Sequence, residues 1–327
     1  MRRSASRRAT PTADLRLLYF GTPDFAVPAL RALASSSHTL VGVVSQPDRP
    51  RGRGRTLDGT PVKIAATEIG VDVLQPEKVG DESALAWMRA REPELGVVVA
   101  FGQFIPKSVR ELPRLGLINA HASLLPRWRG AAPIEWAIDA GDPRTGISVM
   151  RVVKEMDAGD VCLVRETAIG ADETAGEVSA RLAELAAQAL LDAVDQLANG
   201  RAVFAPQGSV RVTLAPKLDR GFAQLDFTQP AERLLRRIRA ATPRPGVDIE
   251  LVRAAKRMRI VRAKLGPDHF GHARPGALRV EAGRLLLAAG DAYLELEQIQ
   301  LAGKRPMRAD ELLRGFRVPD AEEARTP

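Results

Sequence analysis

The chain has 327 residues, of which 45% are apolar, and it carries a formal net charge of +8 at pH 7. This length favours two domains, and the apolar content is ordinary for a globular protein with packed cores. No stretch of the sequence approaches the roughly 20 apolar residues that a membrane helix needs, which excludes an integral helical membrane protein.

Cysteine and histidine usage narrows the chemistry further. Cys162 is the single cysteine, so the chain forms no internal disulfide and no cysteine-rich metal site. It lies in the apolar stretch AGDVCLVRE, and we interpret it as an inert core thiol. The four histidines are scattered along the chain, so we expect no metal centre. A reducing cytoplasm is the simplest location for such a protein.

The chain begins with the arginine-rich, acid-free segment MRRSASRRATPTA. This composition is typical of a transit peptide, but the segment is short and has no apolar periodicity. We therefore predict a disordered tail over residues 1–13, with the first domain beginning at residue 14.

The first half of the chain alternates between strand and helix patterns. The order strand, turn, helix, strand predicts a βαβ unit, and its repetition predicts an α/β domain with a Rossmann-like, doubly wound parallel sheet over residues 14–203. The first turn, GTPDFA, lacks the spacing G-x-G-x-x-G, which excludes dinucleotide binding. The predicted strands are 15–20, 40–46, 71–76, 95–102, 115–122 and 146–153, and the predicted helices are 25–36, 64–70, 84–92 and 175–199.

A basic loop, QPDRPRGRGRTLDGTPVK at residues 46–63, follows the second predicted strand. It contains almost nothing to bury, and it lies at the carboxyl edge of the sheet, where open sheets bind ligands. One interpretation is a mobile surface insertion. The other is a segment that orders on a phosphate backbone, as arginine-rich segments do on RNA. The second interpretation uses four alternating arginines, Arg49, Arg51, Arg53 and Arg55.

A second loop follows the strand that ends near Ile118, in the stretch NAHASLLPRWRGAAPIEWAIDAGD. Asn119 and His121 point to the same side if the chain stays extended, and Asp157 follows in another loop, KEMDAGDV. These three side chains supply an amide donor, a titratable imidazole and a carboxylate that orients it. Ser123 lacks the flanking glycines of a nucleophile elbow, so the set favours direct transfer between two bound substrates rather than an acyl-enzyme.

The second half of the chain has a different organisation. We predict a linker over residues 204–216, then a helix over 230–246 with a buried stripe of leucine and isoleucine and a solvated face of arginines. Short strands separated by turns over the next 80 residues or so indicate a small OB-like β-barrel within a second domain, 217–319.

Charge distinguishes this second half from the first. Residues 201–327 carry 24 Lys and Arg against 15 Asp and Glu, a balance of +9, whereas residues 1–200 carry a balance of −1. Such an asymmetry fits either a polyanion partner, above all nucleic acid, or simply a basic solvated face. Composition by itself leaves both interpretations open.

The motifs resemble those of the 10-formyltetrahydrofolate-dependent formyltransferases, and among them the methionyl-tRNA formyltransferases. The resemblance covers about residues 15–319, which excludes the arginine-rich tail and the last eight residues. Asn-x-His with a downstream Asp-x-Gly marks the wider superfamily, whereas HASLLPRWRGAAPI with the Arg-Gly loop is more specific. The matching segments are FGTPDFAVPAL, QPDRPRGRGR, VVVAFGQFIP, SLLPRWRGAAPI, LAPKL, IRAATPRPG and QLAGKRPM.

The resemblance implies a substrate pair and a role for each motif. Formyl would pass from 10-formyltetrahydrofolate to the amino group of methionyl initiator tRNA, with no metal, on a monomeric enzyme. Asn119, His121 and Asp157 would be catalytic, and Ser123, Leu124, Leu125 and Pro126 would line the folate site. The tRNA contacts implied are Arg49, Arg51, Arg53, Arg55 and, on the basic face of the second domain, Arg237.

An alternative within the same chemistry is a formyltransferase for a small amine, such as a UDP-amino-sugar or glycinamide ribonucleotide. Such an enzyme shares the Asn, His and Asp set but needs neither a basic loop nor a basic barrel. An RNA-binding protein on an inactive enzyme scaffold is disfavoured, because all three catalytic residues are present. The sequence leaves the roles of Arg127 and Arg129 open.

Overall fold

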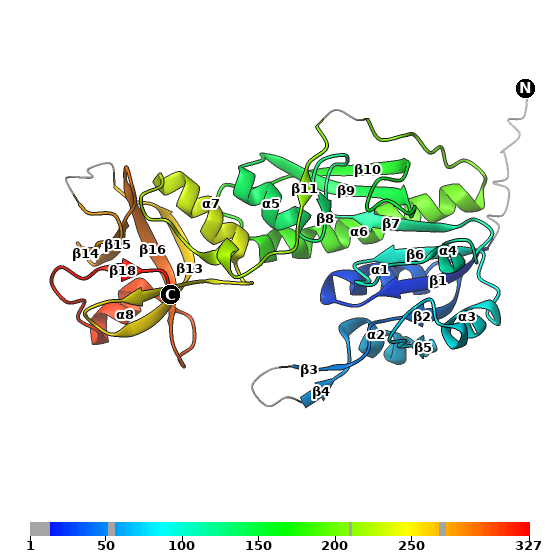
Figure 1. The fold of residues 1–327 in the computed structure, drawn as a ribbon, viewed down its shortest axis with the longest axis horizontal. Coiled ribbons are helices and arrows are strands. Elements are labelled where there is room, and N and C mark those ends of the chain that lie inside the picture. Colours follow the sequence, from blue (N-terminus) through cyan, green and yellow to red (C-terminus); the bar gives the residue numbers. More distant parts are fainter. Residues whose placement is uncertain (1–13, 52–55, 209–210, 268–272) are drawn as a thin grey trace, which may run out of the picture. The chain divides into compact units, whose positions relative to one another are not determined.

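The computed structural model describes residues 14–51, 56–208, 211–267 and 273–327 (Figure 1). The predicted tail and two arginines of the basic loop, Arg53 and Arg55, lie outside the described residues. The chain divides into two compact units, and the bounds predicted for the domains and the linker remain predictions. The first unit runs to Pro126 and adds Gly146–Glu166 and Arg181–Val212, and the second comprises Arg127–Thr145, Thr167–Ala180 and Thr213–Pro327.

A seven-stranded sheet with the order β10-β9-β7-β6-β1-β2-β5 organises the first unit. Five neighbouring strands run parallel, which confirms the predicted α/β class. The predicted doubly wound sheet is thus dominated by parallel pairs, and β9 adds an antiparallel pair with β7. The segment between β7 and β9 begins and ends at the same end of the sheet, so β9 runs back alongside β7 without a crossover connection. The strands are β1 (Arg16–Gly21), β2 (Thr39–Val44), β5 (Val73–Leu74), β6 (Leu95–Val99), β7 (Leu117–His121), β9 (Arg144–Arg151) and β10 (Val161–Ala168).

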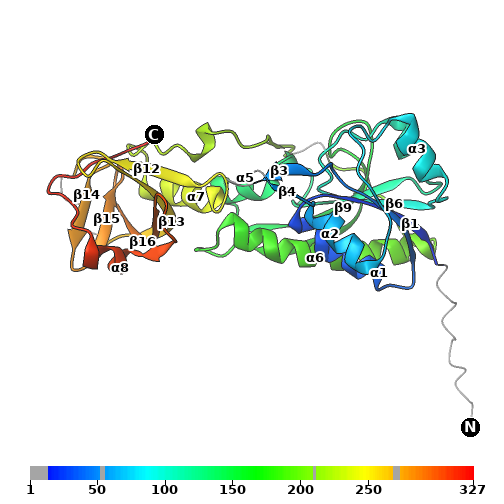
Figure 2. The ribbon, with the colours of Figure 1, turned by 90° about the horizontal axis from the view of Figure 1, so that it is seen from below.

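Helices cover both faces of this sheet, as the doubly wound prediction requires (Figure 2). Helix α3 packs Leu85 and Met88 on one face, against Phe20 of β1 and the other apolar strand residues. On the opposite face, the buried ring of His38 contacts Asp195 of α6 across 3.0 Å. The helices that contribute to this unit are α1 (Val27–Ala34), α2 (Pro61–Ile69), α3 (Glu82–Arg89), α4 (Lys107–Arg110) and α6 (Ala175–Ala198).

The predicted loop after β7 contains a helix, α5 (Pro133–Ala140), and its prediction as a loop throughout is wrong. Proline is favoured in the first turn of a helix because its fixed φ suits the helix and its missing N–H has no partner there. Gly141 ends α5 in the left-handed region, with φ 79°, which glycine adopts without a steric penalty. The signals for this helix are therefore local.

The second unit contains a curled antiparallel sheet with the order β14-β15-β16-β13-β12-β18. A bridge between Ala277 and Glu323 joins its two edges, which confirms the barrel-like prediction. Its strands are β12 (Val247–Leu251), β13 (Lys256–Leu265), β14 (Leu278–Glu281), β15 (Arg284–Ala288), β16 (Tyr293–Leu301), β17 (Met307–Arg308) and β18 (Ala324–Arg325). Helix α5, two further helices, α7 (Ala231–Ala241) and α8 (Ala309–Gly315), and a short pair, β8 (Arg129–Gly130) with β11 (Leu214–Ala215), also belong to this unit.

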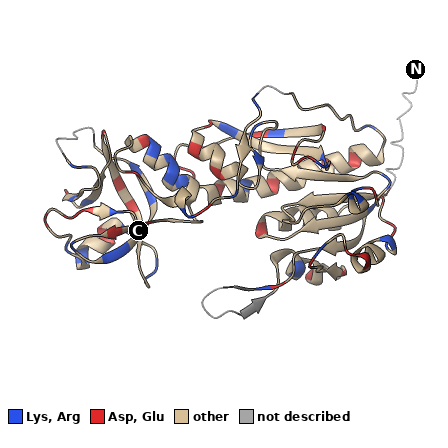
Figure 3. Cartoon of the chain, in the orientation of Figure 1, with Lys and Arg blue, Asp and Glu red and all other residues tan. Residues whose placement is uncertain are grey.

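The arginines of α7, a helix that carries much blue in Figure 3, are half-buried and do not form the solvated face that the sequence predicts. Arg233 and Arg237 both donate to the buried carboxylate of Asp139 on α5, at 2.5–3.0 Å. Arg239 donates to two backbone carbonyls within residues 170–173. That prediction is wrong because helical periodicity distinguishes polar from apolar side chains, but it does not reveal a buried carboxylate far away in the sequence.

Candidate active site at the end of strand β7

Two of the three predicted catalytic residues lie on β7. Asn119 and His121 are separated by one residue, so their side chains point to the same face of the sheet. In the antiparallel pair with β9, Asn119 lies opposite Met150 and His121 lies opposite Ser148. The His121 side chain is almost fully buried, with only 6% of the residue exposed. A buried imidazole at a strand end is held in one orientation, as proton transfer requires.

The third residue, Asp157, lies in the loop between β9 and β10. Its Oδ2 is 3.6 Å from Nδ1 of His121, so the fold brings Asp157 beside the end of β7. Asp157 has a positive φ of 51°, a conformation in which aspartate is several-fold enriched among residues other than glycine. Gly159 is required nearby, since a Cβ there would overlap the carbonyl oxygen of Arg151. The carboxylate is therefore held by a tight turn pressed against β9.

Ser148 is a site residue that the sequence reasoning missed. Its hydroxyl donates to the carbonyl of Ser123 at 2.7 Å and accepts from the N–H of Leu125 at 3.1 Å. Ser148 thereby fixes the predicted folate segment to β9, the strand that pairs with β7. The serine in the mainly apolar stretch GISVM is the signal in the sequence.

The four residues predicted to line the folate site differ in exposure. Ser123 is fully buried, whereas Leu124, Leu125 and Pro126 are half-buried and present apolar surface beside the end of β7. The structure therefore offers an apolar strip next to polar groups, which is the usual composition of a small-molecule site.

The basic loop forms a hairpin of β3 (Arg49–Arg51) and β4 (Thr56–Asp58). Its base is anchored at Asp48, whose carboxylate accepts from Gln75 at 2.6 Å, from the Thr60 N–H at 3.2 Å and from Lys63. Hydrogen bonds from Gln75 and Lys63 lower the pKa of Asp48, which keeps this carboxylate charged at neutral pH. Arg49 is exposed beside this anchor.

The arginines whose roles the sequence left open, Arg127 and Arg129, have structural partners. Arg127 makes a bidentate ion pair with Asp142, at 2.6 and 2.9 Å, and its guanidinium lies 4.6 Å from the ring of Trp128. The Trp128 indole also donates to Asp142, at 2.7 Å. Arg129 belongs to β8, where its N–H donates to the carbonyl of Thr213. The motif RWRG thus fixes its own segment.

Arg237, predicted to contact tRNA, also has internal partners. Besides Asp139, it donates to the carbonyl of Phe222 at 2.8 Å, and its guanidinium lies 4.3 Å from that aromatic ring. Its contact with tRNA stays a prediction.

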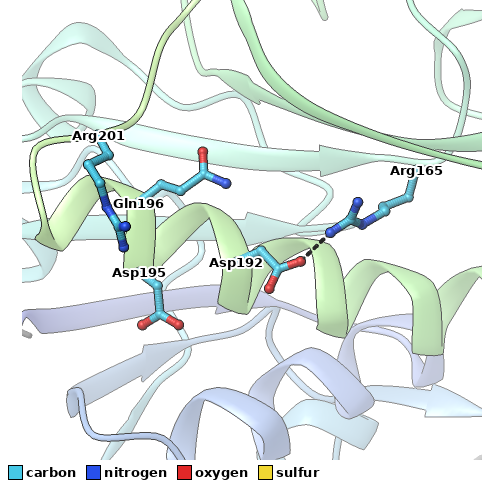
Figure 4. Close-up of a pocket in the computed structure, with 5 residues that line it drawn as sticks. All are labelled: Arg165, Asp192, Asp195, Gln196 and Arg201. Atoms are coloured by element: carbon cyan, nitrogen blue, oxygen red, sulfur yellow. Dashed lines mark hydrogen bonds and ion pairs between the residues drawn. The ribbon is translucent and has the colours of Figure 1, made fainter. Parts of the chain in front are cut away.

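A separate hollow of about 560 Å³ lies against α6 and contains none of the predicted site residues (Figure 4). Three of its charged groups have partners, since Arg165 pairs with Asp192 at 2.5 Å and Asp195 pairs with His38. The residues that line it are Arg165, Asp192, Asp195, Gln196 and Arg201.

The sequence matches two family descriptions that cover most of its length. Residues 15–194 match "Formyl transferase", and residues 217–317 match "Formyl transferase, C-terminal domain". The chain belongs to the formyl transferase family. A family member from Chromohalobacter salexigens, described as methionyl-tRNA formyltransferase, is 42% identical over 94% of this chain and 96% of its own. One from Xanthomonas campestris with the same description is 44% identical over 93% and 98%.

Solved structures of the formyl transferase family share the fold. The sugar 3N-formyl transferase WlaRD, crystallised in the presence of dTDP and 5-N-formyl-tetrahydrofolate, superposes with a TM-score of 0.65 at 13% identity. The match covers 89% of this chain and 99% of that one. At this identity the likeness concerns the fold alone.

Among the described residues, no helix has the length and apolarity needed to cross a membrane. Within the same part of the chain, no three or more His, Cys, Asp or Glu side chains are grouped so that they could hold a metal ion.

Proposed function

We propose that the chain transfers the formyl group of 10-formyltetrahydrofolate to the amino group of methionine esterified to initiator tRNA, for translation initiation. The identity of 42–44% to relatives described as methionyl-tRNA formyltransferases, over nearly the whole of each chain, carries this proposal. The convergence of Asn119, His121 and Asp157 supplies the chemistry.

The trio fits direct acyl transfer between two bound substrates. The methionyl amine attacks the formyl carbon, and the carbonyl oxygen gains negative charge. The Asn119 amide and the His121 imidazole donate hydrogen bonds to this oxygen, and Asp157 orients the imidazole. The proton that the amine loses passes through His121 and Asp157. N10 of the folate takes up a proton as the C–N10 bond breaks. The products are formyl-methionyl-tRNA and tetrahydrofolate.

The surrounding segments hold the two substrates in this proposal. Leu124, Leu125 and Pro126 contact the folate and keep water from the formyl group. The β3–β4 hairpin, with Arg49 exposed, contacts phosphates near the acceptor end of the tRNA. The second unit, which contains most of the +9 segment, contacts the rest of the tRNA. We also infer that the enzyme acts as a monomer in the cytoplasm.

Purified protein incubated with 10-formyltetrahydrofolate labelled in the formyl group tests the acceptor. We expect label on charged methionyl initiator tRNA and none on UDP-amino-sugars or glycinamide ribonucleotide. Label on a small amine instead of the tRNA would replace this proposal with the small-amine alternative. Uncharged initiator tRNA is the control, because it lacks the α-amino group of methionine.

A further inference from the structure

We propose that Gln207 is a positioning residue for catalysis, which fixes Asp157 against His121. This inference rests on the proposed function, because it needs Asp157 to act in formyl transfer. Gln207 lies 50 residues beyond Asp157 along the chain, within the segment that the sequence predicts as a linker.

A single nitrogen of Gln207 holds the turn that carries Asp157. Its Nε2 donates to the backbone carbonyls of Asp157 and Gly159, both at 2.8 Å. A primary amide nitrogen has two hydrogens, so one group satisfies both carbonyls. The two carbonyls belong to the turn in which Asp157 has a positive φ and Gly159 leaves no room for a Cβ. The Gln207 amide therefore stabilises the conformation of this turn by donating to two of its carbonyls at once.

Gln207 is itself fixed to the same part of the sheet. Two residues earlier, Ala205 forms a bridge with Val161 at the start of β10, through two hydrogen bonds of 2.9 Å. Phe204 lies under the guanidinium of Arg151, at 3.9 Å from ring centre to carbon. The backbone that carries Gln207 is thus docked on the strands that flank the Asp157 turn.

Gln207 also touches the strand opposite the other catalytic residues. Its Nε2 lies 3.9 Å from the sulfur of Met150, and Met150 is the β9 residue paired with Asn119. One side chain therefore contacts both the turn that bears the carboxylate and the strand paired with β7. From this location, Gln207 sets the distance between the Asp157 carboxylate and the His121 imidazole.

That distance leaves little tolerance. The separation between Nδ1 of His121 and Oδ2 of Asp157 is 3.6 Å, just beyond a direct hydrogen bond. A movement of a few tenths of an ångström in the turn decides whether the two groups bond as the substrates arrive. Loss of the Gln207 donors removes the restraint on that movement.

The test replaces Gln207 with methionine, which has a similar length and no N–H donor, and compares it with Gln196→Met. Gln196 lines the separate hollow against α6 and is the matched control. For Gln207→Met we expect kcat to fall about 10- to 100-fold, with the KM for each substrate changed by less than about threefold. We expect the pH profile of kcat to shift as well, since the pairing of His121 with Asp157 changes. Gln196→Met should retain the parent kcat and profile.

A double-mutant cycle separates positioning from a general structural role. In an Asp157→Asn background, Gln207→Met should lower kcat little further, because its effect passes through the carboxylate. An equal loss in both backgrounds, or a parent-like kcat for Gln207→Met, would overturn the inference. If Asp157→Asn itself leaves kcat unchanged, the role of Asp157 in the proposed function fails instead. Thermal unfolding of each variant checks folding, and Gln207→Glu replaces the methionine variant in the same cycle if that variant does not fold.

Discussion

The two histidines that contact carboxylates show how one residue type serves two purposes. His38 accepts at Nδ1 from the N–H of Leu15, at 3.2 Å, so its Nε2 carries the proton and donates to Asp195. Both of its ring nitrogens are occupied by structural partners. His121 lies at the end of β7 beside the apolar strip, and its Nδ1 is 3.6 Å from Oδ2 of Asp157. In the proposed function His121 moves the proton, whereas His38 is a structural tether.

We expect His121→Ala to lower kcat for formyl transfer by about 10²- to 10⁴-fold, the usual contribution of a general acid or base. Binding of methionyl initiator tRNA, measured by filter retention, should change little, because the substitution leaves the basic surfaces intact. His38→Gln is the matched comparison and should lower the thermal unfolding midpoint while preserving kcat. An unchanged turnover in His121→Ala would contradict the assigned role.

Cys162, which we interpret from the sequence as unreactive, lies half-buried on β10. Burial raises the pKa of the Cys162 thiol, which keeps the thiol protonated at neutral pH. The local environment thus agrees with an unreactive thiol.

The element with the most direct link to function beyond β7 is the β3–β4 hairpin. Its tip lies outside the described residues, but its base is defined by the contacts of Asp48 with Gln75, Thr60 and Lys63. These contacts connect the hairpin to α2 and to the segment after β5. A basic segment held at its base loses less entropy when it binds than a fully flexible one does.

We expect Asp48→Ala to raise the KM for methionyl-tRNA by about tenfold, because releasing the hairpin adds an ordering cost to tRNA binding of the order of 1.4 kcal/mol. The KM for 10-formyltetrahydrofolate should stay within about twofold, since Asp48 and its hydrogen-bond partners lie in segments other than the proposed folate segment. Steady-state kinetics with each substrate varied in turn checks this. A change confined to the folate KM would show that the hairpin does not serve the tRNA.

At the scale of the whole molecule, a buried charge cluster holds α7 to α5 within the second unit. Asp139 is 3% exposed and receives bidentate hydrogen bonds from two arginines, Arg233 and Arg237. Burial would raise the pKa of Asp139, but the hydrogen bonds and charges of the two arginines outweigh it and lower that pKa. The family's two regions, 15–194 and 217–317, therefore meet through this cluster, because α5 belongs to the first and α7 to the second.

We expect Asp139→Asn to lower the free energy of unfolding by about 3 kcal/mol at pH 7, since it leaves two partly buried guanidinium groups without their buried counter-charge. The folded pKa of Asp139 is depressed, so its contribution is present above the ordinary carboxyl pKa and is lost as the pH falls through the folded value. The difference between parent and variant should therefore shrink below about pH 4. Denaturant unfolding at several pH values measures it, and a constant difference down to pH 2 or so would contradict the linkage.

The sequence by itself determined the elements whose signals are local. Apolar strand stretches such as LGVVV and the long alanine-rich helix were predictable because burial imposes a periodicity that the residues carry wherever they lie. Asn119 and His121 were identifiable as a polar pair at a strand end, and their motif also linked them to Asp157. Helix α5 has local signals in its proline and glycine, but the polar motif that precedes it in the sequence is more typical of a loop.

Only the tertiary structure decided which distant residues meet. The antiparallel pairing of β9 with β7 places Ser148 opposite His121. The bridge between Ala205 and Val161 places Gln207 against the turn that carries Asp157. Arg233 and Arg237, which the helical pattern predicts as solvated, bind a carboxylate more than 90 positions earlier in the chain. Such pairings depend on how the chain closes on itself, and hydrogen-bond donors and acceptors carry no periodicity from which partners can be predicted.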